Sequence, residues 1–147
     1  MVDIENPGVA LRRFTLAAPV VSCVEAAEAK GIDLERELKS LLIVTSTGPV
    51  LVHIRGNRRL SLRAIKRLLS VDEARLAPAS DLQELGLAPG TVSPFASTLW
   101  AMRQLVTREI LRLAWVTTNA GISDAYVMFE PAILLQAPTI SVGDFEL

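Results

Sequence analysis

The stretch SLLIVTSTGPVLVHIR, residues 40–55, decides the fold. Its first half, SLLIVTS, is an apolar run of the length and composition of a buried strand. Residues 47–49, Thr-Gly-Pro, are typical of a turn. The second half alternates, so that one face of a strand carries Val50, Val52 and Ile54. The pattern predicts two strands joined by a turn, with His53 on the more polar face of the second strand.

Helical patterns precede this pair of strands. A first helix is expected over residues 7–18, because a proline stands at each of its ends. A second is expected over residues 23–30, where Ser22 and Glu25 form a capping box and a glycine follows the last residue. A further helical turn is expected over residues 34–39, which would place Lys39 at the junction of a short helix and an apolar strand.

After the two strands, Ser61 can cap a helix whose apolar residues recur at helical spacing. A second capping box begins at Ser80, and a last helix begins at Pro131. Strand patterns occupy residues 103–107, 113–118 and 125–130. Helices and two strands first, with several strands later, indicate an α+β fold on a mixed, largely antiparallel sheet with flanking helices.

Composition limits the classes of function. The chain has 147 residues, half of them hydrophobic, and a net charge of −1, so residues 1–147 are expected to form one domain with no global field for nucleic acid or membrane. A single cysteine and a single histidine exclude an internal disulfide and a cysteine-rich zinc site. Arg12-Arg13 and the apolar run behind it resemble a secretion leader only weakly, so a cytoplasmic protein without a membrane segment is expected.

Common catalytic motifs are missing from the sequence. No serine lies in a GxSxG elbow, and neither GxxxxGK[ST] nor GxGxxG occurs. What remains are two glycine-containing loops, GTVSP at residues 90–94 and NAG at residues 119–121, together with Lys39. On physical grounds alone, Lys39 is an exposed or structural lysine and GTVSP is as readily an ordinary turn as a ligand-binding loop.

The ordered set of segments is more specific than any one of them. VEAAEAKGIDLERELKSLLI, then a strand pair, then GTVSPF and then LAWVTTNAG resemble the YbaK/EbsC family, whose fold is shared with the editing domain of bacterial prolyl-tRNA synthetases. The resemblance covers roughly residues 20–136. It implies a curled sheet and an aminoacyl-tRNA deacylase that cleaves the ester between a wrong amino acid and the terminal ribose of a tRNA.

The resemblance also assigns residues to this chemistry. It places the catalytic groups at Lys39 and Gly90, with no metal, no cofactor and no covalent intermediate. Substrate binding is expected at Ser40, Thr91, Val92, Ser93, Pro94, Asn119, Ala120 and Gly121. Gly90 would let the loop backbone approach a ligand closely, and Pro94 would make the loop rigid. Such a site would act mainly by positioning the ester and stabilising the charge that develops on it.

Other reactive or aromatic residues receive structural interpretations. His53 is expected to be a surface or half-buried polar residue rather than a base. Cys23 has no basic neighbour in sequence that would lower its thiol pKa, so it is expected to be a small residue at a helix start. Trp100 and Trp115 are expected in the core or a pocket wall, although Trp100 follows the loop closely enough to line an adenosine site.

Basic residues are concentrated after the second strand. The members expected to contact tRNA are Arg55, Arg58, Arg59 and Arg63. They could form a local positive surface for an acceptor stem, recognised through its phosphates. A solvated helix face and hairpin tip explain the same residues almost as well.

The leading hypothesis is therefore a free-standing trans-editing hydrolase acting on mischarged aminoacyl-tRNA, with alanine or cysteine on tRNA(Pro) as substrate. A non-catalytic module of the same fold, which binds tRNA or an aminoacyl-tRNA synthetase, is the alternative. A hydrolase of small esters or amides, active without tRNA, is a third hypothesis.

Overall fold

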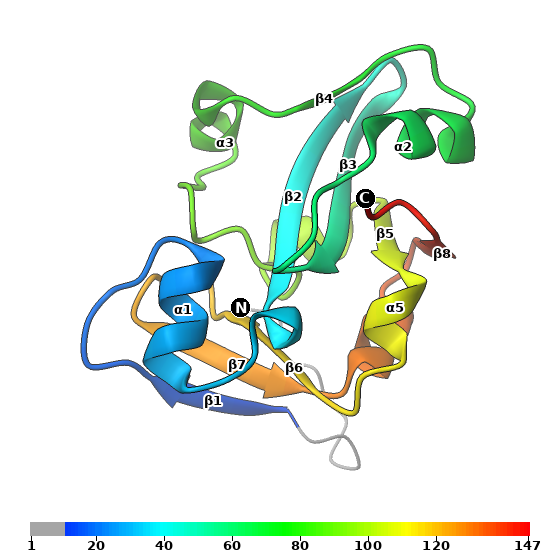
Figure 1. Cartoon of the computed structure of the whole chain (residues 1–147). Coiled ribbons are helices and arrows are strands. Elements are labelled where there is room, and N and C mark those ends of the chain that lie inside the picture. Colours follow the sequence, from blue (N-terminus) through cyan, green and yellow to red (C-terminus); the bar gives the residue numbers. More distant parts are fainter. Residues whose placement is uncertain (1–10) are drawn as a thin grey trace.

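The predicted strand pair forms the middle of the larger of two sheets in the computed structural model, which describes residues 11–147 (Figure 1). β2 (Leu38–Thr45) and β3 (Gly48–Arg55) pair antiparallel across a two-residue turn. β5 (Gln104–Thr107) pairs in parallel with β3, and β8 (Ile140–Gly143) in parallel with β5. The predicted pair of strands is confirmed, and it supplies the scaffold of the sheet.

The other edge of this sheet is only partly covered. β4 (Ala74–Leu76) pairs antiparallel with β2, but only with residues 43–45. Among the strands that the structure describes, none pairs with that edge of β2 over residues 38–41. At the start of β2 the Leu38 carbonyl accepts from the Thr118 hydroxyl at 3.4 Å, so the open edge of β2 lies over residues 39–41.

The smaller sheet has the order β1-β7-β6 and is wholly antiparallel. Its strands are β1 (Arg12–Thr15), β6 (Val116–Asn119) and β7 (Ala125–Phe129). A single bridge between Glu37 and Thr117 links it to the start of β2. The α+β class with mixed, largely antiparallel strands is confirmed, with the strands divided between two sheets.

The helix expected over residues 7–18 is wrong in its described part. Residues 12–15 form β1 instead, and residues 7–10 lie outside the described residues. All four residues of β1 are exposed, so the apolar side chains do not form the core-facing stripe that a helix would need. Phe14 stacks on Tyr126 of β7 with ring centroids 5.0 Å apart. Cross-strand pairing of this kind overrides a weak local preference for helix.

The first capping box is confirmed. α1 (Cys23–Lys30) begins after Ser22, whose side chain accepts a hydrogen bond from the Glu25 amide, and Gly31 ends it in the left-handed conformation. The turn expected over residues 34–39 is shorter, a 3₁₀ helix η1 (Leu34–Arg36). Lys39 consequently lies within β2 and not at the end of a helix.

The later helices follow the sequence less closely. α2 (Leu62–Leu69) is capped by Ser61 as predicted. α3 (Ala79–Glu84) begins after Pro78, so the capping box expected at Ser80 is wrong. The remaining helices are α4 (Ser97–Trp100), α5 (Arg108–Leu111) and the 3₁₀ helix η2 (Pro131–Gln136). Within residues 11–147, no helix is both long enough and apolar enough to span a membrane.

The two faces of the strand pair pack against different partners. On one face, Val52 and Ile54 are buried against Ile65 of α2. On the other, Leu42 and Leu51 pack with residues of α3 and of the loop before α4. α2 and α3 thus lie at the upper end of the molecule in Figure 1, and α1 lies at the lower end. The space between α1 and α3 contains the candidate site.

Candidate functional site

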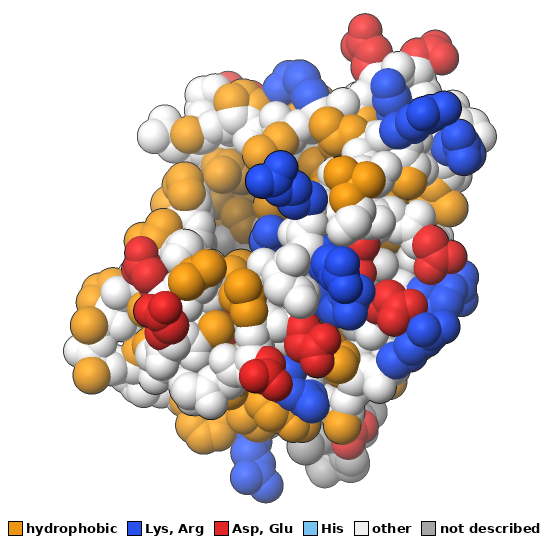
Figure 2. Space-filling model, viewed as in Figure 1, with side chains coloured by type: hydrophobic (Ala, Val, Ile, Leu, Met, Phe, Trp, Pro, Cys, Tyr) orange, Lys and Arg blue, Asp and Glu red, His pale blue; other side chains and the backbone are white. Residues whose placement is uncertain are grey.

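A cavity of about 350 Å³ opens between α1, the open edge of β2, α3 and the loop that leads to residue 92. Figure 2 shows a hollow on this face of the molecule, bordered by hydrophobic side chains. Its apolar walls include Ala26, Leu38, Leu42, Leu82, Val92 and Ala125. The volume lies within the range of ordinary small-molecule sites. The cavity is thus large enough for a small ligand in mostly apolar surroundings.

Five of the predicted site residues line this cavity, although they come from three distant segments of the chain. They are Lys39, Ser40, Gly90, Val92 and Asn119. Thr91, Ser93, Pro94, Ala120 and Gly121 belong to the same two loops but are not among the lining residues. The fold therefore brings together the lysine and the two glycine-containing loops that the sequence singled out.

Lys39 has no carboxylate partner within residues 11–147. Its Nζ donates a hydrogen bond to the main-chain carbonyl of Arg58 at 2.9 Å. None of the ion pairs between described residues includes Lys39. An ammonium has three N–H donors, so one bond to a carbonyl leaves two for another partner. Lys39 is therefore equipped to bind an anion or a developing negative charge at the cavity.

Asn119 joins the two glycine-containing loops. Its Nδ2 donates to the carbonyl of Val92 at 2.8 Å, while its Oδ1 accepts from the amide of Gly121 at 2.8 Å. The side chain thus bonds one loop with its donor and the other with its acceptor. This arrangement fixes the distance between the loops at the mouth of the cavity.

The polar side chains of GTVSP hold the loop itself in shape. The hydroxyl of Thr91 donates to the carbonyl of Ala88 and accepts from its amide. Ser93 is buried, and its Oγ accepts from the Phe95 amide at 3.3 Å. These contacts account for both hydroxyl residues without any ligand.

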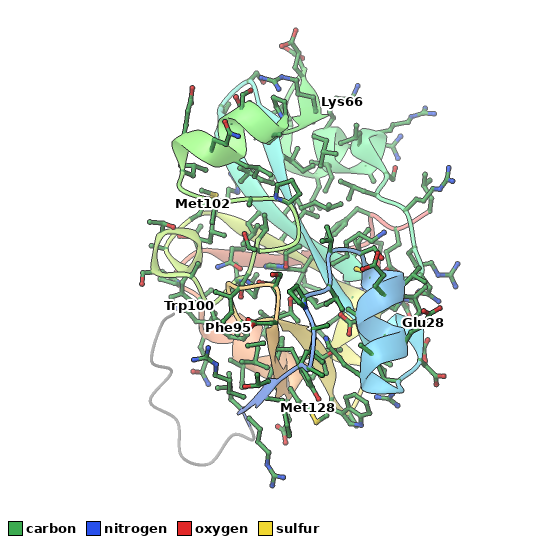
Figure 3. The ribbon with its side chains drawn as sticks, turned by 90° about the vertical axis from the view of Figure 1, so that its left-hand side faces the viewer. Glu28, Lys66, Phe95, Trp100, Met102 and Met128 are labelled. Atoms are coloured by element: carbon green, nitrogen blue, oxygen red, sulfur yellow. The ribbon has the colours of Figure 1, made fainter. Side chains whose placement is uncertain are left out.

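Phe95 anchors the end of the loop in the core. Its ring is fully buried, meets Phe129 edge-on at 4.9 Å and stacks on Trp100 at 5.8 Å. Figure 3 shows Phe95 and Trp100 next to each other. Trp100 is therefore a packing residue and does not line the cavity. Trp115 also lies outside the cavity lining, under the Arg36 guanidinium at 4.3 Å from its ring centroid.

Gly90 is required for two reasons that lie within the protein. Its φ is +82°, in the left-handed region that side chains disfavour. A Cβ at this position would lie 3.0 Å from the carbonyl oxygen of Val21. The close approach that the glycine permits is thus to the segment before α1, which forms another wall of the cavity.

Replacing Gly90 with alanine is expected to destabilise the protein and to displace the loop. The left-handed conformation alone costs about 1–2 kcal/mol for a residue with a Cβ, and the contact with Val21 adds to this cost. Gly86→Ala is the matched control, because Gly86 also has a positive φ, +72°, but has open space around its Cβ position. Urea unfolding should show a larger loss for Gly90→Ala. Equal losses for the two variants would contradict the role of the Val21 contact.

A buried ion pair in the cavity wall was missed by the sequence analysis. Lys30 Nζ lies 2.6 Å from Glu37 Oε1, and the hydroxyl of Thr117 donates to the same oxygen at 2.7 Å. The two charged side chains are 2% and 4% exposed. Burial lowers the pKa of Lys30, although Glu37 opposes that shift, and Lys30 Nζ lies 4.4 Å from the ring centroid of Tyr126. The tertiary fold alone brings Lys30, Glu37 and Thr117 together, so no local sequence pattern indicates that they meet.

His53 is fully buried, so the expectation of a surface or half-buried residue is wrong. Its Nδ1 lies 2.8 Å from Ser40 Oγ, and its Nε2 lies 2.7 Å from Gln104 Oε1. Burial lowers the pKa of His53 to about 4. The expectation failed because the face that carries Leu51 and His53 packs against α3 and α4, which alternation within one strand does not show. His53 is neutral at physiological pH and connects the cavity residue Ser40 to the core.

Cys23 lies at the start of α1, as expected, and lines the cavity. Burial, and next the charge of Glu37, raise the pKa of its thiol. A thiol with a raised pKa is a poor nucleophile at neutral pH. The direction of this shift agrees with the expectation that Cys23 is a small residue at a helix start.

The four arginines of the predicted basic surface differ in their contacts. Arg55 pairs with Glu146 at 2.7 Å, a contact that raises its pKa, so its charge is largely compensated. Arg58, Arg59 and Arg63 are exposed. The carbonyl of Arg58 accepts from Lys39, so this basic loop adjoins the cavity. Lys and Arg side chains gather beside the hollow in Figure 2.

Part of this chain is similar in sequence to known proteins. A proline–tRNA ligase of Xanthomonas axonopodis pv. citri (strain 306) is 31% identical over 108 residues, which are 73% of this chain and 19% of the ligase. A proline–tRNA ligase of Lactobacillus delbrueckii subsp. bulgaricus is 36% identical over 101 residues, which are 67% of this chain and 18% of the ligase. The chain thus spans about a fifth of the length of these relatives.

Two solved structures share the fold over nearly the whole chain. A crystal structure of a hypothetical protein superposes with a TM-score of 0.84 and 27% identity, covering 94% of this chain and 92% of that one. A proposed trans-editing enzyme for prolyl tRNA synthetase superposes with a TM-score of 0.82 and 28% identity, covering 93% and 87%. The model of the aminoacyl-tRNA editing domain matches residues 17–137, which include every residue that lines the cavity except Leu16. This chain belongs to the aminoacyl-tRNA editing domain family.

Proposed function

We propose that this protein is a trans-editing hydrolase that removes alanine or cysteine from mischarged tRNA(Pro). The observation that carries the proposal is the meeting of Lys39 with the GTVSP loop at one apolar cavity. The lysine has no carboxylate partner among the described ion pairs, and Asn119 holds the loop in place. A cation beside a mostly apolar pocket suits stabilisation of the negative charge that forms when an ester is hydrolysed.

The proposed chemistry is the attack of water on the ester carbonyl. A new C–O bond forms to water, and the bond from the carbonyl carbon to the ribose oxygen breaks. The ribose oxygen takes up one proton of the water, and the free amino acid releases the other to solvent. Lys39 would stabilise the charge that develops on the substrate, while Gly90, Val92 and Asn119 would hold the ester against the open edge of β2. Catalysis in this scheme rests on positioning.

The choice of tRNA(Pro) follows from the relatives. One similar solved structure is described as a proposed trans-editing enzyme for prolyl tRNA synthetase, and this protein covers 87% of its chain. The matched ligases are proline-specific by name. The apolar walls of the cavity suit small, uncharged side chains such as those of alanine and cysteine. A prolyl-tRNA synthetase is then a candidate partner, and the cytoplasm is the proposed location.

A panel of substrates tests the proposal. The protein would be incubated with tRNA(Pro) carrying alanine, cysteine or proline, and with alanine ethyl ester, and release of the amino acid would be followed. We expect release from Ala- or Cys-tRNA(Pro), little from Pro-tRNA(Pro) and none from the free ester. Hydrolysis of the free ester at a similar rate would favour a small-molecule hydrolase. Binding of every tRNA without turnover would favour a non-catalytic module.

The exposed arginines next to the cavity are expected to bind tRNA phosphates. Replacement of Arg58, Arg59 and Arg63 with alanine should weaken tRNA binding and make its dependence on salt less steep, by about one unit of log–log slope for each lost phosphate contact. The affinity would be measured between low and physiological salt. Arg112→Ala is the control, since Arg112 is exposed but pairs with Glu109 and lies outside the cavity lining. An unchanged slope in the triple variant would contradict the prediction that these arginines contact tRNA phosphates.

A further inference from the structure

The open edge of β2 has a direction that its hydrogen bonds define. The Leu42 carbonyl accepts from the Ala77 amide, and the Ser46 amide donates to the Glu73 carbonyl. Both groups therefore point away from β3, toward the side where β4 lies. In an antiparallel ladder, alternate residues bond the same neighbour, so every second residue of β2 points its peptide groups to this side. Counting back from Leu42, the next such residue is Ser40.

The peptide groups of Ser40 face the cavity. β4 pairs with residues 43–45 and ends before it reaches Ser40, and no other described strand takes its place. Ser40 lies opposite His53 in a pair of the kind that does not exchange main-chain hydrogen bonds with β3. It is also one of the residues that line the cavity. Its main-chain N–H and C=O are thus directed at the place where a ligand would lie.

The hydroxyl of Ser40 is occupied on the other side. The amide nitrogen of Gln104 donates to the carbonyls of Trp100 and Leu99, at 2.9 and 3.3 Å, which turns its Oε1 toward His53. His53 must then donate from Nε2, and its Nδ1 is left as the acceptor of the Ser40 hydroxyl proton. This assignment follows from the hydrogen-bond network. The network fixes Ser40 at the edge of the strand without using its main chain.

We propose that the main chain of Ser40 binds the aminoacyl group of the substrate. Its N–H donates to the ester carbonyl oxygen, and its C=O accepts from the α-ammonium. The amino acid would dock as a single added strand residue, in the way that peptides extend a sheet edge. Only main-chain groups of the protein and the carbonyl and ammonium groups of the substrate take part, so this contact can bind an α-amino acid with any side chain. Selection among side chains is then left to the cavity walls.

This inference rests on the proposed function and adds a donor to its chemistry. When water attacks, the electron pair of the carbonyl moves to its oxygen, and the Ser40 N–H strengthens its hydrogen bond to that oxyanion. The pair returns as the bond to the ribose oxygen breaks, and the ribose oxygen takes up a proton from the attacking water. Lys39, the preceding residue, supplies charge beside this donor.

Two substitutions at Ser40 separate its side chain from its main chain. Ser40→Ala removes the hydroxyl and keeps the N–H, whereas Ser40→Pro removes both. Proline is tolerated on an edge strand where its nitrogen points away from the neighbouring strand. Relative to Ser40→Ala, we expect Ser40→Pro to lower kcat for deacylation of Ala-tRNA(Pro) by about 100- to 1,000-fold, the usual effect of losing one oxyanion donor. KM should change much less, because the bond strengthens mainly in the transition state.

A chemical substitution of the main chain keeps the test decisive if Ser40→Pro does not fold. Replacing the amide before Ser40 with an ester removes the N–H, weakens the Lys39 carbonyl as an acceptor on the β3 side, and should give the same loss of kcat. Equal kcat in the Ala variant, the Pro variant and the ester form would overturn the inference while the proposed function stands. No turnover by the wild-type protein would overturn the proposed function and this step with it.

Discussion

Replacing Lys39 with alanine is expected to lower kcat/KM for deacylation of Ala-tRNA(Pro) by about 100- to 1,000-fold, with the fold intact. The effect is large because Lys39 is the cation at the cavity that carries no carboxylate partner among the described ion pairs. A preorganised charge beside a developing oxyanion is worth that much in other hydrolytic sites. The side chain is partly exposed on β2 and bonds a single carbonyl, so its loss should cost little stability.

Lys66→Ala is the matched control for this prediction. Lys66 lies on α2 and outside the cavity lining, and Figure 3 shows it at the end of the molecule opposite Met128. Its removal changes the net charge by the same amount, so any general electrostatic effect on tRNA binding appears in both variants. A loss confined to Lys39→Ala supports the site. Equal activity of Lys39→Ala and wild type would refute the role of the lysine, although the family membership would stand.

Replacing Lys30 with methionine is expected to lower the free energy of unfolding by about 3–5 kcal/mol. Removing one partner of a buried ion pair leaves the other as an uncompensated buried charge, which has this cost in other proteins. Lys30 and Glu37 are both almost fully buried, and Thr117 bonds the same carboxylate oxygen. Urea unfolding followed by circular dichroism would measure the loss.

The double variant Lys30→Met, Glu37→Gln tests the cause of that loss. If the unpaired carboxylate is responsible, neutralising it should restore much of the stability, because the amide oxygen can still accept from Thr117. If Lys30→Met alone lowers the free energy of unfolding by less than about 1 kcal/mol, the pair contributes no more than an exposed surface ion pair does. Such a result would contradict the burial that the structure gives it.

The local features that the sequence predicts correctly depend on neighbouring residues. The two central strands follow from an apolar run, a turn and an alternating run, and α1 follows from the capping box of Ser22. The meeting of Lys39 with the two glycine-containing loops follows from their resemblance to a family, and the structure brings these segments to one cavity. Periodicity and capping alone could not have placed them together.

The features that the sequence does not predict depend on distant residues. Residues 12–15 form a strand because β7 is available to pair with them, and His53 is buried because α3 and α4 pack on its face of β3. β4 and β8 are short and have no alternation long enough to recognise. Lys30 and Glu37 meet through the packing of α1 on the start of β2. In each case a tertiary contact outweighs the local preference.

The open edge of β2 is the clearest example of this limit. The sequence gives a continuous strand over its whole length, and nothing in it indicates that the neighbouring strand stops before Ser40. Only the pairing of β4 shows where main-chain groups are left for a ligand. The composition of a strand therefore predicts that the strand forms, but not which of its main-chain groups remain unpaired.

The most direct test of the proposed hydrolysis is the rate at which the wild-type protein releases alanine from Ala-tRNA(Pro), measured in single turnover beside Pro-tRNA(Pro). We expect rapid release of alanine, no acceleration of proline release above the uncatalysed rate, and loss of the alanine reaction in Lys39→Ala. Alanine release no faster than in buffer, with the protein folded and bound to the tRNA, would contradict the claim that this cavity hydrolyses the aminoacyl ester.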